Sequence, residues 1–201
     1  MNHLSTDHSN AAATGDDLDI DVGHAETDSD LRQFAAEHQY LGALLYLSVE
    51  QASRLLELVP DTAINRPVTR WAYELIRFLT EQDRPADPVS VLAAGRHRPA
   101  AQSLDPRCVP SARQLHELAM YLADAYTESI GAAFVDRFAR QVLDDAYRRG
   151  FAAFGLRMQR LAETGAERVE LAEQFDAIRE QLTDLWRRCE DGASPTVCVR
   201  S

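Results

Sequence analysis

The side chains that could do chemistry are few, and their types exclude several kinds of enzyme. All 21 basic residues are arginine, and the chain contains no lysine. A phosphate-binding P-loop places a lysine on the terminal phosphates, and Schiff-base catalysis also depends on a lysine amine. Composition alone therefore excludes nucleotide hydrolysis through a P-loop and chemistry through a lysine Schiff base.

The acidic and metal-binding side chains form no catalytic or metal pattern. Asp144 and Asp145 are adjacent, so in a helix they point to different sides, and the segment around them has no Glu-x-x-His pair for a di-metal site. Cys108, Cys189 and Cys198 are odd in number and widely spaced, which favours reduced thiols over a disulfide framework or a zinc site. We expect a protein that is not an enzyme and holds no cofactor or metal.

One segment has the charge that nucleic-acid binding requires. Its basic residues are Arg96, His97, Arg98, Arg107 and Arg113, with Asp105 as its acid. No helix-turn-helix pattern or interleaved aromatic residues accompany them, and the chain as a whole carries a net charge of −11. A solvated loop is the favoured interpretation, and a small helical nucleic-acid-binding regulator is the alternative function.

Most of the negative charge lies at the N-terminus. Residues 1–30 contain eight acidic residues and no arginine, which leaves 24 acidic residues against 21 arginines in the rest of the chain. Such a segment buries too little apolar surface to offset its ordering entropy, so we predict a disordered acidic tail over residues 1–30. Residues 192–201 are expected to form a flexible C-terminal tail.

No apolar run approaches the roughly 18 residues that a membrane-spanning helix needs. The N-terminus also lacks the basic start and apolar core of a signal peptide. We expect a cytoplasmic protein.

From residue 31 onward, apolar residues recur at helical spacing and no run alternates as a strand would, which predicts an all-α fold. A small head of about five helices is expected over residues 31–128, with Gly42 at a close helix contact and Val89 and Leu92 pointing into the core. The expected capping signals are the Ser48–Gln51 box, Asn65 with Pro67, and Asp87 with Pro88.

Two long helices are predicted to follow as an antiparallel hairpin over residues 129–191. Ser129 is expected to cap the first, which runs to about Glu163, and the second runs from about Arg168 to Glu190. Apolar residues along both are spaced alternately three and four apart, which is typical of a coiled-coil seam. The predicted seam comprises Tyr147, Phe151, Phe154, Met158 and Leu161 on the first helix and Leu171, Phe175, Ile178, Leu182 and Leu185 on the second.

The seam residues are also the predicted protein-interaction surface. A helix of about 34 residues spans roughly 50 Å, whereas a head of about 95 residues is roughly 30–35 Å across. The hairpin must then project beyond the head, and a partner hairpin would complete its packing. The alternative is a compact bundle in which the seam closes on the head.

Three segments in order resemble the N-terminal domain of DnaB-type replicative helicases. They are "EHQYLGALLYLSVEQASRLLELV" (37–59), "NRPVTRWAYELIRFLTEQDRPADPVSVLAA" (65–94) and "YLADAYTESIGAAFVDRFARQVLDDAYRRGFAAFG" (121–155). Family members open with a glutamate and a Leu-Gly-Ala-Leu-Leu core, as Glu37 and residues 41–45 do here. The chain departs from the family at Ile64, Asn65 and Thr69, where an aromatic pair and a histidine are usual, and at "SARQLHELAM", which replaces a Gly-Gly.

The resemblance implies a stand-alone N-terminal domain without the RecA-like motor that follows it in the helicases. It implies a non-catalytic replication accessory that self-associates into a homo-oligomer or joins a helicase collar through its hairpin, with helicase, primase or loader as partners. Whether the chain recruits, loads or inhibits a helicase is left open.

We predict that the chain does not bind ATP with magnesium, because it lacks lysine and any Gly-x-x-x-x-Gly-Lys segment. Calorimetric titration of ATP and Mg²⁺ into the full chain should show no binding heat. Tight, magnesium-dependent binding would overturn the exclusion.

Overall fold

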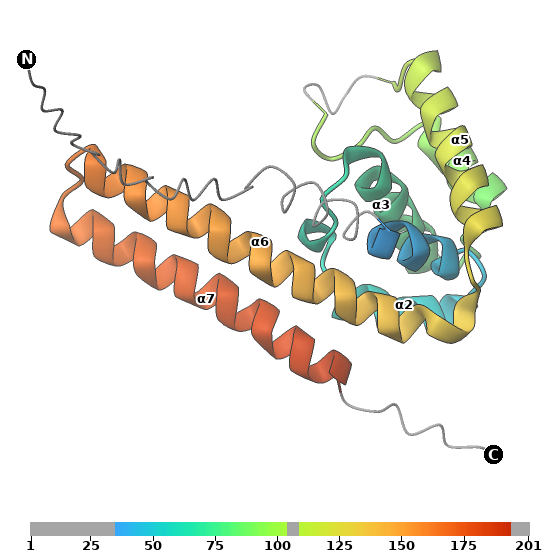
Figure 1. Cartoon of the computed structure of the whole chain (residues 1–201). Helices are drawn as coiled ribbons and strands as arrows, with labels where there is room; N and C mark the ends of the chain where they lie inside the picture. Colours follow the sequence, from blue (N-terminus) through green and yellow to red (C-terminus); the bar gives the residue numbers. More distant parts are fainter. Residues whose placement is uncertain (1–34, 104–108, 194–201) are drawn as a thin grey trace, which may run out of the picture.

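The computed structural model describes residues 35–103 and 109–193, and every regular element within them is helical. The predicted all-α fold is confirmed for these residues, whereas the predicted acidic tail over 1–30 lies outside them. The elements, drawn in Figure 1, are a helix over residues 35–44, α2 (Val49–Leu58), η1 (Asp61–Ala63), α3 (Pro67–Glu81), α4 (Pro88–Gly95), α5 (Ala112–Glu128), η2 (Ala132–Phe134), α6 (Val135–Glu163) and α7 (Arg168–Ala193).

Two of the predicted helix caps are confirmed. The Ser48 Oγ accepts the Gln51 backbone N–H at 3.3 Å, and the Gln51 side chain returns to the Ser48 backbone, which completes the capping box of α2. The Asp87 carboxylate accepts the N–H groups of Val89 and Ser90 at 2.9 and 3.1 Å. These bonds satisfy backbone donors that the first turn of a helix leaves without partners.

Three local predictions are wrong. The N-cap of α3 is Arg66, whose side chain makes no capping bond, and not Asn65, whose backbone N–H donates to Glu37. Ser129 ends α5 and does not begin α6, because the chain turns at Gly131 (φ 95°) before η2 and α6. Val89 is 77% exposed, since the single buried stripe of the short helix α4 runs through Val91 and Gly95.

The core of the head is built around α3. Its residues Tyr73, Leu75, Ile76 and Leu79 are buried on several sides. The Tyr73 hydroxyl donates to the Val59 carbonyl at 2.7 Å, so the phenol is satisfied, and burial raises its pKa well above the usual value. One helix therefore contacts most of the other elements of the head.

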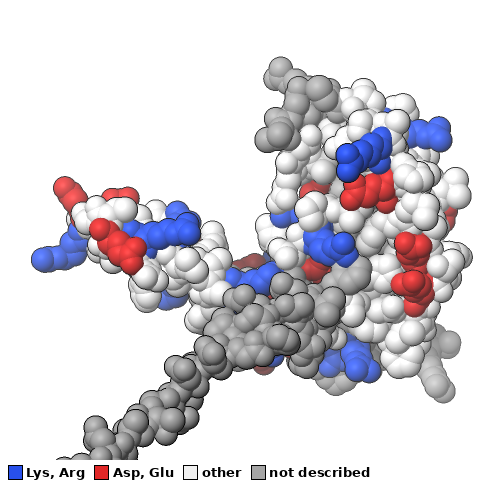
Figure 2. Space-filling view, turned by 45° about the horizontal axis from the view of Figure 1, so that its top comes forward, with Lys and Arg blue, Asp and Glu red and all other residues white. Residues whose placement is uncertain are grey.

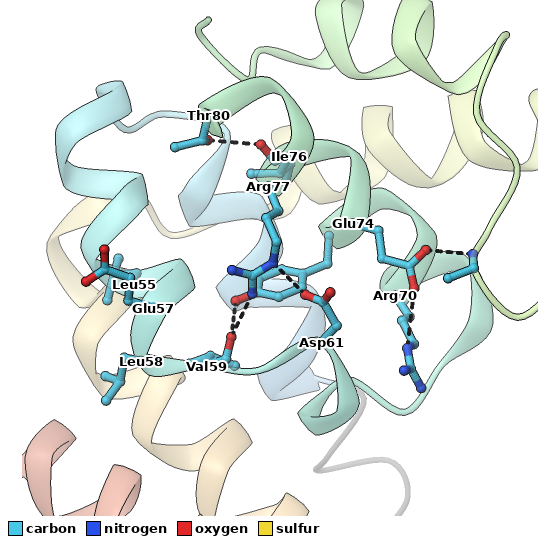
Figure 3. Close-up of polar contacts among 12 residues, drawn as sticks. Leu55, Glu57, Leu58, Val59, Asp61, Arg70, Glu74, Ile76, Arg77 and Thr80 are labelled. Atoms are coloured by element: carbon cyan, nitrogen blue, oxygen red, sulfur yellow. Dashed lines mark hydrogen bonds and ion pairs between the residues drawn. The ribbon is translucent and has the colours of Figure 1, made fainter. Parts of the chain in front are cut away.

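Ionic contacts fix the turn after α2 to α3 (Figure 3). The Arg77 guanidinium donates to the Asp61 carboxylate at 2.9 Å and to the Val59 carbonyl at 3.2 Å. Nearer the start of α3, Glu74 pairs with Arg70 at 3.5 Å and accepts the Ala101 backbone N–H at 2.9 Å. These contacts hold the loops of the head against its central helix.

The last two helices lie side by side and antiparallel, and their far ends project away from the head (Figure 1). They are joined by a short turn in which Gly165 has a φ of 73°, a value that favours glycine. The first half of α6 is packed into the head, where its buried residues are Val135, Phe138, Ala139, Val142, Leu143 and Ala146. The C-terminal end of α7 returns to the head, where Arg188 donates to the carbonyls of Glu57 and Leu58 at 2.8 and 3.2 Å.

Gly42 lies where the first helix crosses the end of α5. A Cβ at this position would collide with the Ala125 carbonyl oxygen and lie 2.9 Å from the Ser129 Cβ. The predicted close helix contact at Gly42 is therefore confirmed. Because the nearest atom, the Ala125 carbonyl oxygen, belongs to the backbone, an added Cβ can be accommodated only by a shift of one helix.

We predict that Gly42→Ala lowers the free energy of unfolding by about 1–3 kcal/mol, because it overpacks this crossing. The matched control is Gly155→Ala in α6, where an added Cβ meets nothing within 4 Å. That change should raise stability by about 0.5–1 kcal/mol through helix propensity. Urea unfolding followed by circular dichroism measures both, and equal effects of the two substitutions would contradict the close contact.

Candidate protein interface

The position of the hairpin is set by a buried carboxylate at its junction with the head. Glu37 is 0% exposed and accepts the backbone N–H groups of Asn65 and Arg66 at 2.8 and 3.3 Å. The Arg149 guanidinium of α6 lies 3.8 Å from the same carboxylate and also donates to the Ala63 carbonyl at 2.6 Å. One buried group therefore connects the first helix, the start of α3 and the middle of α6.

A second carboxylate, Asp145, lies one turn before Arg149. Burial raises the pKa of the Asp145 carboxyl, although the nearby guanidinium groups of Arg148 and Arg149 act in the opposite direction. Burial likewise lowers the pKa of Arg149, against the opposing influence of Glu37 and Asp145. The cluster is thus a partly desolvated charge group at the junction. Within the described residues, no group of three or more His, Cys, Asp or Glu side chains is arranged to hold a metal ion.

The helices of the hairpin approach each other closely at Gly150. A Cβ added there would lie 3.2 Å from the Leu182 side chain and 3.8 Å from that of Leu185. Ile178 is buried, with 7% of its surface exposed. The other half-buried members of the predicted seam are Tyr147, Phe154, Met158, Leu161, Leu171, Leu182 and Leu185.

Two predicted seam residues are not inside the hairpin. Phe151 is 53% exposed and Phe175 is 56% exposed. Gly150 and Gln174, one residue earlier in each helix, occupy the half-buried positions. The spacing of apolar residues does not predict these two positions, because glycine and glutamine are not typical core residues. It predicts the neighbouring phenylalanines instead.

The exposed aromatic residues gather on one side of the hairpin. Phe151, Phe175 and Trp186 each follow a half-buried residue by one position, and so each is turned about 100° from it in the same sense. In an antiparallel pair, equal turns in the same sense lead to the same side of both helices. Ring contacts of Tyr147 with Phe151 and Trp186, at centroid distances of 5.0 and 5.8 Å, connect the two helices on that side.

We call this side the aromatic flank and define it by Phe151, Phe175 and Trp186, with Tyr147 at its base. Trp186, which is 53% exposed, was not among the predicted site residues. It lies one position beyond the seam residue Leu185, so a seam pattern does not select it. Its residue type could have indicated this role, because a large aromatic residue beside a seam is a typical interface residue.

The basic segment of the head is only partly within the described residues, where Arg96, His97, Arg98 and Arg113 are exposed. The Arg98 guanidinium lies over the Phe78 ring at 3.8 Å, and Arg107 is outside the described residues. On the face that Figure 2 shows, arginines of the head stand next to acidic side chains. This mixed charge gives the nucleic-acid alternative no additional support.

The chain is similar in fold and sequence to a solved domain, the N-terminal domain of DnaB helicase from Mycobacterium tuberculosis. The TM-score is 0.57 and the sequence identity is 27%, over 75% of this chain and 96% of that one. The two chains therefore share an all-helical fold over most of their lengths. The resemblance to the N-terminal domain of DnaB-type helicases is confirmed.

No family model matches the sequence, and neither does any curated protein. No helix within the described residues combines the length and apolar character that a membrane crossing requires.

We predict that Arg149→Leu lowers the free energy of unfolding by about 2–4 kcal/mol, because it removes a cation from beside a buried carboxylate. The control is Arg148→Leu, whose partner is also a carboxylate but whose side chain is 78% exposed. That change should alter stability by less than about 1 kcal/mol. Urea unfolding of both variants measures these changes in free energy. Equal changes would show that the junction does not depend on Arg149.

Proposed function

We propose that this protein is a non-catalytic assembly module of DNA replication, which self-associates or joins a helicase collar through the aromatic flank of its hairpin. A replicative helicase or a primase is the partner to test first. The similarity to a helicase N-terminal domain supports the class, and the exposed aromatic residues support the surface. The proposal includes a cytoplasmic location, where replication proteins act.

The aromatic flank is the observation that carries this proposal. Large aromatic side chains bury about 150–250 Å² each, so covering three half-exposed rings on each of two copies removes roughly 600 Å² from water. At about 25 cal/mol per Å², that gives about 15 kcal/mol before the cost of association. Because this cost is about 4–15 kcal/mol, the flank supports a weak to moderate association by itself.

Burial separates residues that make the interface from residues that make the hairpin. Phe175 is 56% exposed, but Ile178, one turn away, is 7% exposed. A charge at Phe175 therefore meets solvent in the isolated chain and meets a partner in the assembly. A charge at Ile178 is instead forced into the packing between α6 and α7.

We predict that Phe175→Asp and Trp186→Asp each weaken self-association at least tenfold without unfolding the chain. The matched control is Val169→Asp, because Val169 lies on the same helix, is 67% exposed and is turned about 120° from Phe175. Sedimentation equilibrium across a concentration series should show an unchanged association constant for that control. Ile178→Asp should instead lower the thermal midpoint, because burying an unpaired carboxylate costs several kcal/mol.

Two results would contradict the proposed interface. If the wild-type chain is monomeric at high concentration and does not bind a helicase collar in a mixing experiment, assembly through the flank is wrong. If Val169→Asp weakens association as much as Phe175→Asp, the interface lies on another side of the hairpin.

A further inference from the structure

The helix α5 has a second uncharged face, which points away from the core of the head. Its buried residues Leu118, Tyr121, Leu122 and Ala125 face the other elements of the head. Outside that stripe, charged side chains occupy one narrow line along the helix. The uncharged residues on its other side are Ala119, Met120, Ala123, Tyr126 and Thr127, with His116 among them, whereas Leu115 is half-buried and packs against the core.

This outer face of α5 presents carbon to solvent. Met120 is 52% exposed and Tyr126 is 37% exposed, and the Tyr46 ring, 46% exposed, stacks on Tyr126 at 4.3 Å. Two hydroxyl groups at the face are bonded within the chain, because the Tyr46 hydroxyl donates to the Tyr126 carbonyl at 2.6 Å and the Thr127 hydroxyl donates to the Ala123 carbonyl at 2.8 Å. Such an exposed apolar face is a candidate contact surface.

The dimensions of the face limit what can cover it. A helix of 17 residues is about 25 Å long, and one side of it is about 10 Å wide with its side chains, so the face offers only a few hundred Å². A stable interface buries about 800 Å² on each partner. The face is therefore too small to hold a second copy of this chain by itself, and it matches one side of a single helix. Ala119 and Ala123 at its centre allow another helix to approach closely.

The charges beside the face indicate which charge a partner should carry. Exposed Glu117, Asp124 and Glu128 lie in one line along α5 next to Met120, with Arg113 as the single cation of that line. Glu128 is also bonded to His38 at 3.2 Å, while its side chain remains 66% exposed. A bound helix would have its edge along this acidic line, where lysine or arginine is favoured.

We propose that the outer face of α5 binds one amphipathic helix of another protein, with an apolar face and a Lys/Arg-bearing edge. This goes beyond the proposed function of the hairpin, because the face is on the head and does not include the aromatic flank. Met120, Tyr126 and Tyr46 would contact the apolar face of that helix. Asp124 and Glu117 would pair with its basic edge.

Two designed 18-residue helical peptides test the proposal. Both have the same Leu/Ala face, and one carries Lys/Arg along one edge where the other carries Glu. In fluorescence anisotropy with the full chain, the basic-edged peptide should bind at least tenfold more tightly than the acidic-edged one. Higher salt should reduce that difference, because exposed charges are screened.

Substitutions in the chain then locate the binding site of the peptide. Met120→Glu should lower the affinity for the basic-edged peptide at least tenfold. Ala172→Glu, on an exposed position of α7, should leave that affinity unchanged. The double change Glu117→Arg and Asp124→Arg should reverse the preference between the two peptides. Circular dichroism shows whether each variant keeps its helix content, which is expected because all these positions are exposed.

Three results would overturn the proposal. They are absence of binding by both peptides, equal binding of both, and loss of self-association in Met120→Glu, which would make the face a contact between copies. Failure of hairpin association leaves these results unchanged, because Phe175→Asp and Met120→Glu alter different surfaces.

Discussion

The arrangement of this molecule depends on one carboxylate that is removed from water. Glu37 lies where the first helix meets the start of α3 and the middle of α6, and it is completely buried. A buried charge is costly unless donors surround it, and two backbone N–H groups and the Arg149 guanidinium do so here. Because the Arg149 guanidinium comes from α6, it reaches this carboxylate when the head and the hairpin are docked in this arrangement.

That docking explains why α6 has two different halves. Its first half is held inside the head by Val142, Leu143 and neighbouring residues, so this half is part of the core. Beyond Gly150, α7 is the element that covers it among the described residues, and two helices cannot bury each other on all sides. The outer half therefore keeps apolar rings in solvent, and the aromatic flank results from a hairpin that extends past its own core. A surface of this kind is suited to contacts with other chains.

The outer face of α5 arises in a related way. The buried stripe of α5 runs through Leu118 and Leu122, whereas Met120, Ala123 and Tyr126 on its other side are exposed. The exposed face of a surface helix is usually polar. Instead, Met120, Ala123 and Tyr126 follow one another along the helix, while the charged residues are confined to one line. The aromatic flank and the outer face of α5 are thus on different parts of the fold and have different neighbours.

The sequence by itself determined the helical class and the main helix boundaries, because these follow from local periods and caps such as Ser48 with Gln51. It also indicated the close contact at Gly42, since a glycine between apolar neighbours has a steric meaning that does not depend on distant residues. The resemblance to a helicase N-terminal domain was likewise carried by residues in order along the chain.

Only the tertiary structure decided which side of each helix is covered. The seam spacing selected Phe151 and Phe175 as interior, but the close approach at Gly150 rotates both helices so that the phenylalanines lie on the flank. Asn65 was predicted as a cap, and its backbone instead serves Glu37, which is 28 residues away in sequence. Val89 was predicted to point inward, and it is exposed because α4 buries a different stripe. Local pattern fixes the helix, whereas its rotation about its own axis is set by contacts between residues far apart in the chain.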